Sequence, residues 1–556
     1  MTNPTHGALS RRSLLGGLAA AAAGAAGATA LSACSPGATP GDSGNGGAPS
    51  GGGGGGGSNP PTYVPYEGVK PDKPGTAEGV TPVFYNLPNP TVPREGFPLT
   101  GVKPWKALMQ AIDPQVPAAQ NKAFEQFATS IGTSFNVIYG TYVNYLEKFQ
   151  VTMASDDVPD MCMIVSVAQL PGLLNKYFTD LTDVLGGDNV KKYPGLANIP
   201  TPAWKSAEVN GRLWGIPQPR PPAGSALTAR GDILAKRGVS DPNPKLSNGD
   251  DFMELLKQLT NKDKNEFAMG ADPNGWLLPM MLTMFGAPNI WKVEGGKFIN
   301  QLETEEYKEA LNQAGKIIQA GYLHPNSFSD PASNSAWYTG GITALYYQSF
   351  IGWGGNARSY PEWNVGNVEL PKWDGGGMAP IRKSVAAYGS YVAIKKSDAD
   401  RVDQLLRVCD YIASPFGTKQ YMEVSYGVEG YNYSINDQGN PVSKAGTDNP
   451  GIVPMSYAGG NSGAILFGQG VKESVDAQYD YLSRALPAGI DNPTIGLYSE
   501  TYTSKGATLA KEQLDVQRSI MLGEKPMSAF DDFVKTWKSR VGDKSSEEYA
   551  EAAAQQ

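Results

Sequence analysis

A run of seven consecutive glycines, residues 51–57, limits which part of this chain can fold. Serine, proline, threonine and asparagine surround the run, and few apolar side chains occur between residues 35 and 80. Such a segment cannot bury enough apolar surface to offset the conformational entropy lost on folding. We therefore expect residues 34–80 to form a flexible tether that does not pack on the folded part, which begins near residue 81.

Two short motifs precede the tether: SRRSLL at residues 10–15 and LSAC at residues 31–34, with an alanine-rich apolar run between them. Paired arginines before an apolar run resemble a twin-arginine export signal, and LSAC resembles the bacterial lipobox. This predicts that residues 1–33 are a removed signal peptide and that Cys34 becomes a lipidated N-terminus. The protein would then be anchored to the outer face of the cytoplasmic membrane. The alternative is an ordinary transmembrane helix over residues 14–33.

Charge and cysteine content narrow the class of protein further. The formal net charge of −8 argues against nucleic acid as a partner. The sequence after the leader has no second apolar run of membrane-spanning length. Besides Cys34 the chain has Cys162 and Cys409, which could pair outside the cell, but two thiols so far apart in sequence favour buried free cysteines.

Apolar periodicity predicts an α/β fold. Strands are expected at residues 83–85, 135–139 and 161–165, with helices at residues 121–131 and 142–153 between them. Strands that alternate with helices indicate a mainly parallel sheet. Two later helices are expected at residues 305–319 and 398–413, and two later strands at residues 341–347 and 391–394.

Several motifs, taken in order, resemble one protein family. They are ASDDVPD at 154–160, GRLWGIPQPRPP at 211–222, residues 230–238, YGVEGYNY at 426–433, and GEKP at 523–526 followed by FDDF at 530–533. Together they resemble family 1 extracellular solute-binding proteins of oligosaccharide ABC importers, including the aldouronate type. The resemblance implies a monomer without cofactor that delivers a carbohydrate to the membrane subunits of an importer.

The same resemblance implies two α/β lobes joined by hinge segments, which close over a ligand. We expect lobe 1 to contain residues 81–215 and 336–390, and lobe 2 to contain residues 216–335 and 391–540. Members of this broad class can carry a calcium loop where this chain has NKDKNE at 261–266. Lysines occupy intervening positions of that segment and the turn glycine is missing, so we expect no metal there.

Aromatic side chains in predicted loops are the first candidates for sugar contact, because sugar rings present apolar faces to them. Glycines flank Trp353, which makes it the expected main platform, although its ring could also pack over a loop. Four weaker candidates share a position near strand ends, lobe crossovers or the YGVEGYNY motif: Trp276, Trp337, Tyr388 and Tyr431.

Charged candidates come from the same regions. Arg220 follows a proline-restricted segment at a predicted crossover, where its planar fork of donors would suit a carboxylate or sugar hydroxyls. An ion pair across the hinge is the alternative. The same choice applies to Arg230, Arg382 and Glu429.

The main rival function is a secreted polysaccharide-active enzyme. A glycosidase needs only two suitably spaced carboxylates, which 54 acidic residues cannot exclude. Motifs of serine hydrolases, zinc peptidases and P-loop proteins are missing from the sequence, and His324 is the only histidine after the leader. A peptide- or lipid-binding lipoprotein is a third possibility. We expect binding without catalysis.

Overall fold

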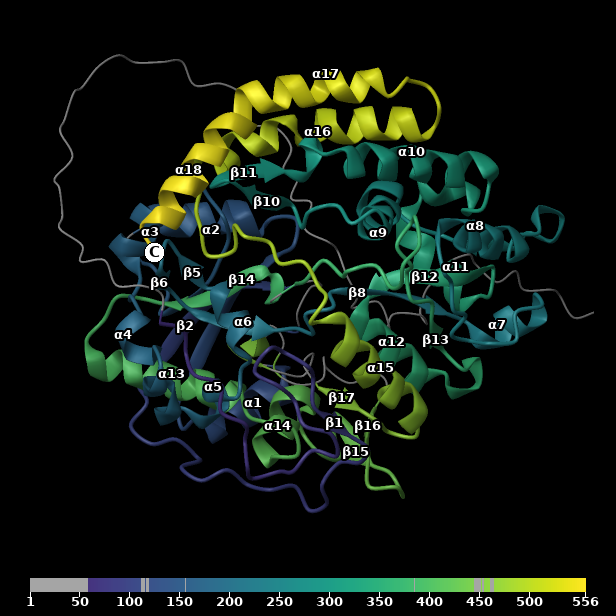
Figure 1. The fold of residues 1–556 in the computed structure, drawn as a ribbon. Helices are drawn as coiled ribbons and strands as arrows, with labels where there is room; N and C mark the ends of the chain where they lie inside the picture. The colour runs from purple at the N-terminus through teal and green to yellow at the C-terminus, as the bar shows by residue number, and fades with distance from the viewer. Residues whose placement is uncertain are drawn as a thin grey trace, which may run out of the picture.

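The computed structural model describes residues 59–111, 116, 120–155, 157–384, 386–444, 452, 455–460 and 465–556. Two sheets, each with its own hydrophobic core, form two lobes (Figure 1). The predicted Cys34 anchor and the glycine run lie outside these residues. None of the helices in the described ranges is both long and apolar enough to cross a membrane.

Lobe 1 is built on a five-stranded sheet of order β3-β2-β4-β14-β7. Its strands are β2 (Trp105–Ala111), β3 (Phe135–Thr141), β4 (Met161–Ile164), β7 (Ile216–Pro219) and β14 (Ala386–Ile394). β14 runs antiparallel to both β4 and β7, and β2 pairs in parallel with β3 and β4. Its helices are α1 (Lys122–Ser130), α2 (Tyr145–Ala154), α3 (Leu170–Tyr177), α4 (Thr182–Leu185), α5 (Pro194–Ala197), α6 (Thr201–Lys205), α13 (Ala399–Ile412) and α14 (Lys419–Tyr426).

Local chemistry explains why the elements of lobe 1 form where the sequence predicts. The Asn121 side chain accepts from the backbone N–H groups of Ala123 and Phe124, which caps α1, and the Asp398 side chain caps α13 in the same way. Cys162 and Cys409 are both buried and unpaired, as favoured by their separation in sequence. The expected strand at residues 83–85 exists as β1 (Val83–Phe84), but it pairs with β17 (Leu466–Phe467) and not with this sheet.

Lobe 2 is built on a four-stranded sheet of order β13-β8-β12-β9. Its strands are β8 (Ser225–Ala229), β9 (Phe267–Met269), β12 (Thr343–Ser349) and β13 (Gly366–Asn367). Its helices are α7 (Gly231–Lys236), α8 (Gly249–Gln258), α9 (Leu278–Met284), α10 (Glu305–Ala320), α11 (Asn334–Thr339), α12 (Phe350–Ser359) and α15 (Lys472–Ala485). The predicted helix at 305–319 is confirmed as α10, which Thr304 caps and which Gly321 ends at a positive φ of 74°.

The C-terminal helices α16 (Glu500–Met521), α17 (Ser528–Trp537) and α18 (Asp543–Ala554) complete lobe 2. They lie along the top of the molecule in Figure 1, and their apolar side chains join the core beneath α10 and β10 (Trp291–Glu294). β10 pairs with β11 (Lys297–Asn300). Two further hairpins join β5 (Glu208–Val209) to β6 (Arg212–Leu213), and β15 (Tyr433–Ile435) to β16 (Pro441–Ser443).

The predicted lobe boundaries are wrong in their second half. β12 was expected in lobe 1 but pairs with β8 and β9, whereas residues 391–394 and α13 were expected in lobe 2 but belong to the core of lobe 1. The reason is that the first lobe 2 segment is longer than predicted. The chain leaves lobe 1 after Pro219 and returns to it only where β14 begins.

The predicted tether is wrong for residues 59–80, because they pack on the folded part. The Thr62 and Val64 backbone N–H groups donate to the carbonyls of Gly187 and Ala197, at 3.0 and 2.8 Å. The Val69 side chain is buried in an apolar cluster with Phe84 and Phe416. Alternating proline and apolar residues give this segment an extended backbone with side chains to bury. We call residues 59–85 the N-terminal strap.

Candidate ligand-binding site between the lobes

The chain passes between the lobes three times, and the third crossing lies between α14 of lobe 1 and α15 of lobe 2. The first two crossovers define the face of each lobe that meets the other. Residues 220–224 connect the end of β7 directly to the start of β8, and residues 382–384 precede β14. The Ser384 N–H donates to the Pro222 carbonyl at 2.9 Å, which holds the two crossovers together. Ligands of α/β proteins commonly bind at the carboxyl ends of strands and at domain boundaries. We call these strand ends and crossovers the interlobe face.

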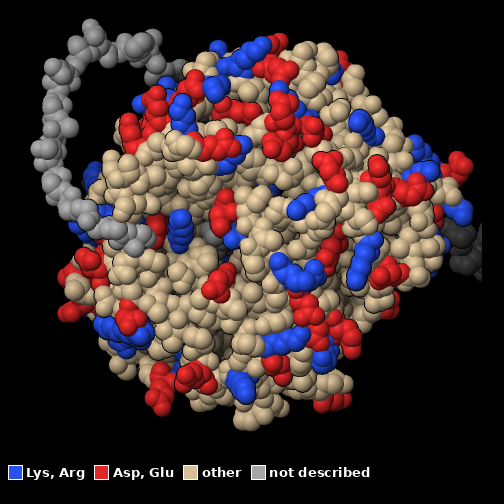
Figure 2. All heavy atoms as spheres, viewed as in Figure 1, with Lys and Arg blue, Asp and Glu red and all other residues tan. Residues whose placement is uncertain are grey.

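Strand directions determine which residues reach the interlobe face. In lobe 1, β2, β3 and β4 run parallel to β7 and end at the same edge as Pro219. In lobe 2, β9, β12 and β13 run opposite to β8 and end at the edge where β8 begins. Figure 2 shows acidic and basic side chains interspersed over the viewed face, so no patch of one sign marks a ligand there.

Trp276 is the sequence-predicted aromatic residue that the fold brings to the interlobe face. It lies in a π-helical turn, η4 (Pro273–Leu277), shortly after the carboxyl end of β9. The Asp272 side chain accepts from the Asn274 N–H at 3.2 Å and caps this turn. The Trp276 ring meets Tyr347 of β12 edge to face, with centroids 5.9 Å apart, and remains partly exposed. It therefore offers an aromatic face held by a second ring.

Tyr347 connects Trp276 to the polar groups of the face. Burial raises the pKa of its phenol, whose hydrogen-bonding neighbours are Thr283 and Ser225. The hydroxyl therefore stays protonated at neutral pH. The Tyr347 phenol and the Arg382 guanidinium also interact electrostatically.

Arg382 is the charged group of this surface, at the start of the second crossover. One Nη donates to Gln301 Oε1 of η5 (Gln301–Glu303), while Nε is buried and has no hydrogen-bond partner among the described residues. Burial lowers the pKa of the guanidinium, and the nearby phenols of Tyr347 and Tyr307 oppose that shift. No Asp or Glu of the described chain forms an ion pair with it.

The C-terminal part of the chain also reaches the interlobe edge of lobe 1. Tyr498 Oη and the Gln169 backbone N–H both donate to Glu500 Oε2, at 2.6 and 2.7 Å. Gln169 lies between β4 and α3, whereas Glu500 begins α16. Tyr142 and Val143, just after β3, are 42% and 93% exposed. Sequence reasoning missed all of these residues. For Tyr142 and Val143, the position directly after an apolar strand was a usable signal.

The expected main platform, Trp353, is a core residue. It is 2% exposed and packs against Phe350 and Tyr481 in a third apolar cluster, and its Nε1 donates to the Val365 carbonyl at 3.3 Å. The flanking glycines serve packing, because a Cβ at Gly354 would lie 3.0 Å from Gln478. Trp353 therefore offers no face to a ligand in this structure.

Trp337 and Arg230 are also engaged within lobe 2. Trp337 stacks on His324 with centroids 3.7 Å apart and is 9% exposed. Arg230 donates two hydrogen bonds to the Asp232 carboxylate, at 2.7 and 2.8 Å, and lies over the Trp363 ring at 3.8 Å. Arg230 is therefore held in an ion pair, but the pair lies within lobe 2 and not across the hinge as the alternative stated.

The remaining predicted residues are dispersed. Glu429 is exposed next to β15, and the Tyr431 ring lies 4.1 Å from the Lys122 ammonium. Tyr388 lies in β14, but its side chain is outside the described part of the structure. Arg220 lines a cavity of about 370 Å³ that the N-terminal strap forms with Pro219, Pro415 and Phe416.

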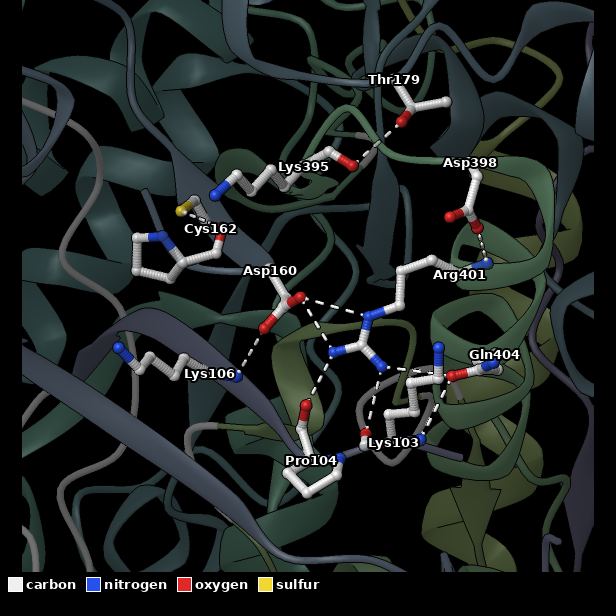
Figure 3. A network of polar contacts seen from close by, with 11 residues as sticks. Lys103, Pro104, Lys106, Asp160, Cys162, Thr179, Lys395, Asp398, Arg401 and Gln404 are labelled. Atoms are coloured by element: carbon white, nitrogen blue, oxygen red, sulfur yellow. Dashed lines mark hydrogen bonds and ion pairs between the residues drawn. The ribbon is translucent and has the colours of Figure 1, made fainter. Parts of the chain in front are cut away.

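A second cavity, of about 390 Å³, lies at the opposite edge of the lobe 1 sheet, where β2, β3 and β4 begin. Its Asp160 carboxylate accepts from the Lys106 backbone N–H and from Arg401 Nη2, both at 2.9 Å (Figure 3). Arg401 also donates to the carbonyls of Lys103 and Pro104. The hydrogen-bond donors and acceptors of these groups therefore pair with one another. The cavity lies at the sheet edge opposite to the crossovers.

The described residues contain no cluster of three or more His, Cys, Asp or Glu side chains that could hold a metal ion. In the segment 261–266, which the sequence analysis compared with a calcium loop, Asn261 caps a 3₁₀ turn over Lys262–Lys264. The Lys262 ammonium donates to the Ala320 carbonyl at 3.0 Å.

Comparison with known proteins places the chain in a family. Residues 122–451 match the family described as bacterial extracellular solute-binding protein. Lipoprotein LipO of Bacillus subtilis is 24% identical over 467 residues, covering 79% of this chain and 89% of LipO. The polygalacturonan/rhamnogalacturonan-binding protein YtcQ of the same organism is 22% identical over 468 residues, covering 81% of this chain and 91% of YtcQ.

A solved structure shows the same fold. The solute-binding protein from Bifidobacterium longum infantis, described as HMO-binding and ABC-transporter associated, superposes with a TM-score of 0.60 at 15% identity. The match covers 82% of this chain and 99% of the other. The family match spans more than half of the chain, and the fold has the two lobes expected of such proteins. The chain belongs to the bacterial extracellular solute-binding protein family.

Proposed function

We propose that this protein captures an oligosaccharide between its lobes and delivers it to an ABC importer. The observation that carries the proposal is the partly exposed Trp276 ring, held edge to face by Tyr347 at the carboxyl ends of two lobe 2 strands. An aromatic face beside fixed polar groups suits the apolar face and the hydroxyls of a sugar ring. The carbohydrate-binding name of YtcQ and the description of the Bifidobacterium protein support the same ligand class.

Capture would proceed by rotation of the lobes about the crossovers that join them. Hinge closure is the usual mode of periplasmic binding proteins, and the short segments at 220–224 and 382–384 are suited to it. Closure would bring the lobe 1 strand end near Tyr142 and Val143 over a ligand seated on Trp276. The C-terminal contact of Glu500 with Gln169 would move with this closure.

Location and assembly form part of the same proposal. LipO is named a lipoprotein, which supports an anchor through Cys34 on the outer face of the cytoplasmic membrane. Twin-arginine export and a monomeric state remain proposals from the sequence. Replacement of Cys34 by Ala should release the protein from membranes, and retention of an unmodified N-terminus on the membrane would contradict the anchor.

The protein is proposed to act by binding alone. No observation in the described residues favours the glycosidase alternative over the binding family to which the chain belongs. Incubation with candidate oligosaccharides, followed by product analysis, separates the two. Unchanged oligosaccharide is expected, and accumulation of shorter products would support the enzyme.

The test of carbohydrate capture is a thermal-shift screen of the mature chain against oligosaccharides, followed by calorimetric titration of the best ligand. A ligand at a hundred times its Kd stabilises the native state by about 2.7 kcal/mol. Trp276→Ala should weaken binding about thirtyfold, which corresponds to about 2 kcal/mol for a central aromatic contact. The control is Trp373→Ala, because Trp373 is also partly exposed in lobe 2 but stacks on Phe285. Equal losses in the two variants would remove Trp276 from the site.

A further inference from the structure

The segment that connects α15 to α16 lies against lobe 1, although both helices belong to lobe 2. The Asn210 N–H donates to the Gly496 carbonyl at 2.8 Å, and the Asn210 side chain accepts from the Tyr498 N–H at 3.0 Å. The Tyr498 ring packs against the lobe 1 core, whereas Leu497 packs against the lobe 2 core. Consecutive side chains therefore enter different lobes, so the two lobes meet at this point of the chain.

Glu500, two residues after Tyr498, is carried by lobe 2. The Ser499 hydroxyl donates to the Glu548 carboxylate of α18 at 2.6 Å. The Thr501 N–H and hydroxyl donate to the same carboxylate, at 2.9 and 2.8 Å. The residues on both sides of Glu500 are thus fixed to the C-terminal helices, and Glu500 moves with them.

The Glu500 carboxylate accepts from two donors that lobe 1 holds. The Gln169 N–H donates to Oε2 at 2.7 Å, and the Tyr498 hydroxyl donates to it at 2.6 Å. Burial and the Glu500 carboxylate raise the pKa of the Tyr498 phenol, so the phenol keeps its proton at neutral pH. Hydrogen bonds to a carboxylate are roughly twice as strong as those between neutral groups. Glu500 therefore joins lobe 2 to lobe 1 through two charge-assisted hydrogen bonds.

The lobe 1 side of this contact is the loop that follows β4 on the interlobe face. Gln169 precedes α3 with a positive φ of 58°, which is unusual for a residue with a side chain, and its side chain makes no capping hydrogen bond. The Leu170 N–H, at the start of α3, donates to the Tyr498 hydroxyl at 3.4 Å. Backbone conformations of this kind occur at ligand clamps and switch regions. Groups outside lobe 1's own sheet and helices thus complete the start of α3.

The contact lies near the surface, so water can replace it. Gln169 is exposed, and Glu500 and Tyr498 are half-buried. Separation of the lobes would transfer the carboxylate and the Gln169 N–H to water, and neither group would be left buried and unpaired. The two hydrogen bonds can therefore break and form again as the lobes move.

We propose that Glu500 is a latch for lobe closure, which accepts from Gln169 and Tyr498 when the lobes are closed and releases Gln169 when they open. This inference rests on the proposed function, and it gives Glu500 a positioning role that requires no contact with the ligand. A latch that favours the closed arrangement raises the population able to hold a ligand, and the apparent affinity increases by the same factor.

Small-angle X-ray scattering of the ligand-free chain that begins at Ser35 tests the latch without a saccharide. Glu500→Ala should increase the radius of gyration, because the open arrangement gains population. Tyr498→Phe, which keeps the ring and removes the donor, should increase it in the same direction. Glu512→Ala, at an exposed position of α16, is the matched control and should leave the radius unchanged. Equal radii in all of these proteins would overturn the proposal.

Hydrogen exchange of the Gln169 amide reports on the latch itself, because Glu500 is the acceptor for this N–H. In the unmodified protein, exchange should slow when the saccharide that binds most tightly in the thermal-shift screen is added. In Glu500→Ala it should be about fivefold faster or more. An exchange rate that responds neither to the saccharide nor to the substitution would show a contact without a role in closure, and would overturn the proposal.

Binding measurements separate this inference from the function on which it rests. Glu500→Ala should weaken saccharide binding about tenfold, mainly through faster dissociation. Glu500→Gln keeps an acceptor oxygen without the charge and should weaken binding less, by about threefold. Unchanged affinity in Glu500→Ala would overturn the latch and leave carbohydrate capture standing. No binding to any saccharide would overturn the proposed function, while the scattering comparison would still decide whether Glu500 holds the lobes together.

Discussion

The amino-terminal edge of the lobe 1 sheet and the interlobe face each contain an arginine beside strand ends. Only the arginine at the amino-terminal edge has its charge balanced by a carboxylate of the described chain. Arg401 donates to the Asp160 carboxylate and to two backbone carbonyls, so its charge is balanced inside the fold (Figure 3). Arg382 has a neutral amide acceptor and a buried, unpartnered Nε. The difference indicates that the first arginine holds structure together, whereas the N–H donors of the second are not all used among the described residues.

The largest expected effect comes from making a balanced arginine resemble Arg382. Asp410 accepts from Arg94 and from the backbone N–H groups of Gly195 and Leu196. Asp410→Ala should lower the free energy of unfolding by about 3–5 kcal/mol, because it leaves the Arg94 charge buried and unpaired. Denaturant unfolding measures this. Asp532→Ala, in an exposed pair with Lys535, should change stability by less than about 0.5 kcal/mol. Similar small losses in both variants would contradict the comparison.

The second effect separates a packing tryptophan from a binding one. Trp353→Ala should lower the free energy of unfolding by about 3–5 kcal/mol, since it empties a core site. Ligand affinity per folded molecule should stay unchanged. Trp276→Ala should show the opposite pattern, with affinity lost and stability largely kept. Thermal unfolding and calorimetric titration of both variants measure this, and a Trp353 variant that is stable but cannot bind would reverse the assignment.

The third effect concerns the N-terminal strap. A chain that begins at residue 81 loses the buried Val69 and the ion pair of Lys73 with Asp476. Burial of one valine contributes about 1.5–3 kcal/mol, so the shortened chain should unfold at a lower denaturant concentration. Comparison with a chain that begins at Ser35 gives the measurement. Identical unfolding curves would mean that the strap adds nothing to stability.

The smallest expected effect is a pH dependence of the free energy of unfolding that comes from His324. Burial lowers the pKa of His324, so the unfolded chain takes up a proton at higher pH than the folded chain does. Stability should therefore fall as pH drops below about 6.5, by no more than about 1.4 kcal/mol for each pH unit. His324→Gln should flatten the profile between about pH 5.5 and pH 7.5. An unchanged slope in that variant would assign the dependence to other groups.

Sequence reasoning succeeded where local chemistry decides the structure. The caps Asn121 and Asp398 and the stop at Gly321 marked α1, α13 and α10 within a few residues. It failed where distant segments choose their partners. Residues 83–84 were identified as a strand, but their pairing with Leu466 and Phe467 depends on the finished fold. The strand β2 was missed altogether, although it lies at the centre of the β3-β2-β4 pairing.

The candidate site shows the same limit at the level of single residues. Glycines around Trp353 suggested an exposed ring, but in α12 they let Gln348 and Gln478 approach the helix closely. Trp276, the weaker candidate, reaches the interlobe face because a turn after β9 carries it there. Arg382 was a charged candidate from the sequence, but the lack of a partner for its Nε among the described residues depends on the finished fold.

The most direct test is a crystal structure of the mature chain grown with the saccharide that binds most tightly in the thermal-shift screen. We expect a saccharide between the lobes, with a sugar ring over Trp276. A saccharide bound elsewhere, such as in the cavity beneath the N-terminal strap, would contradict this expectation.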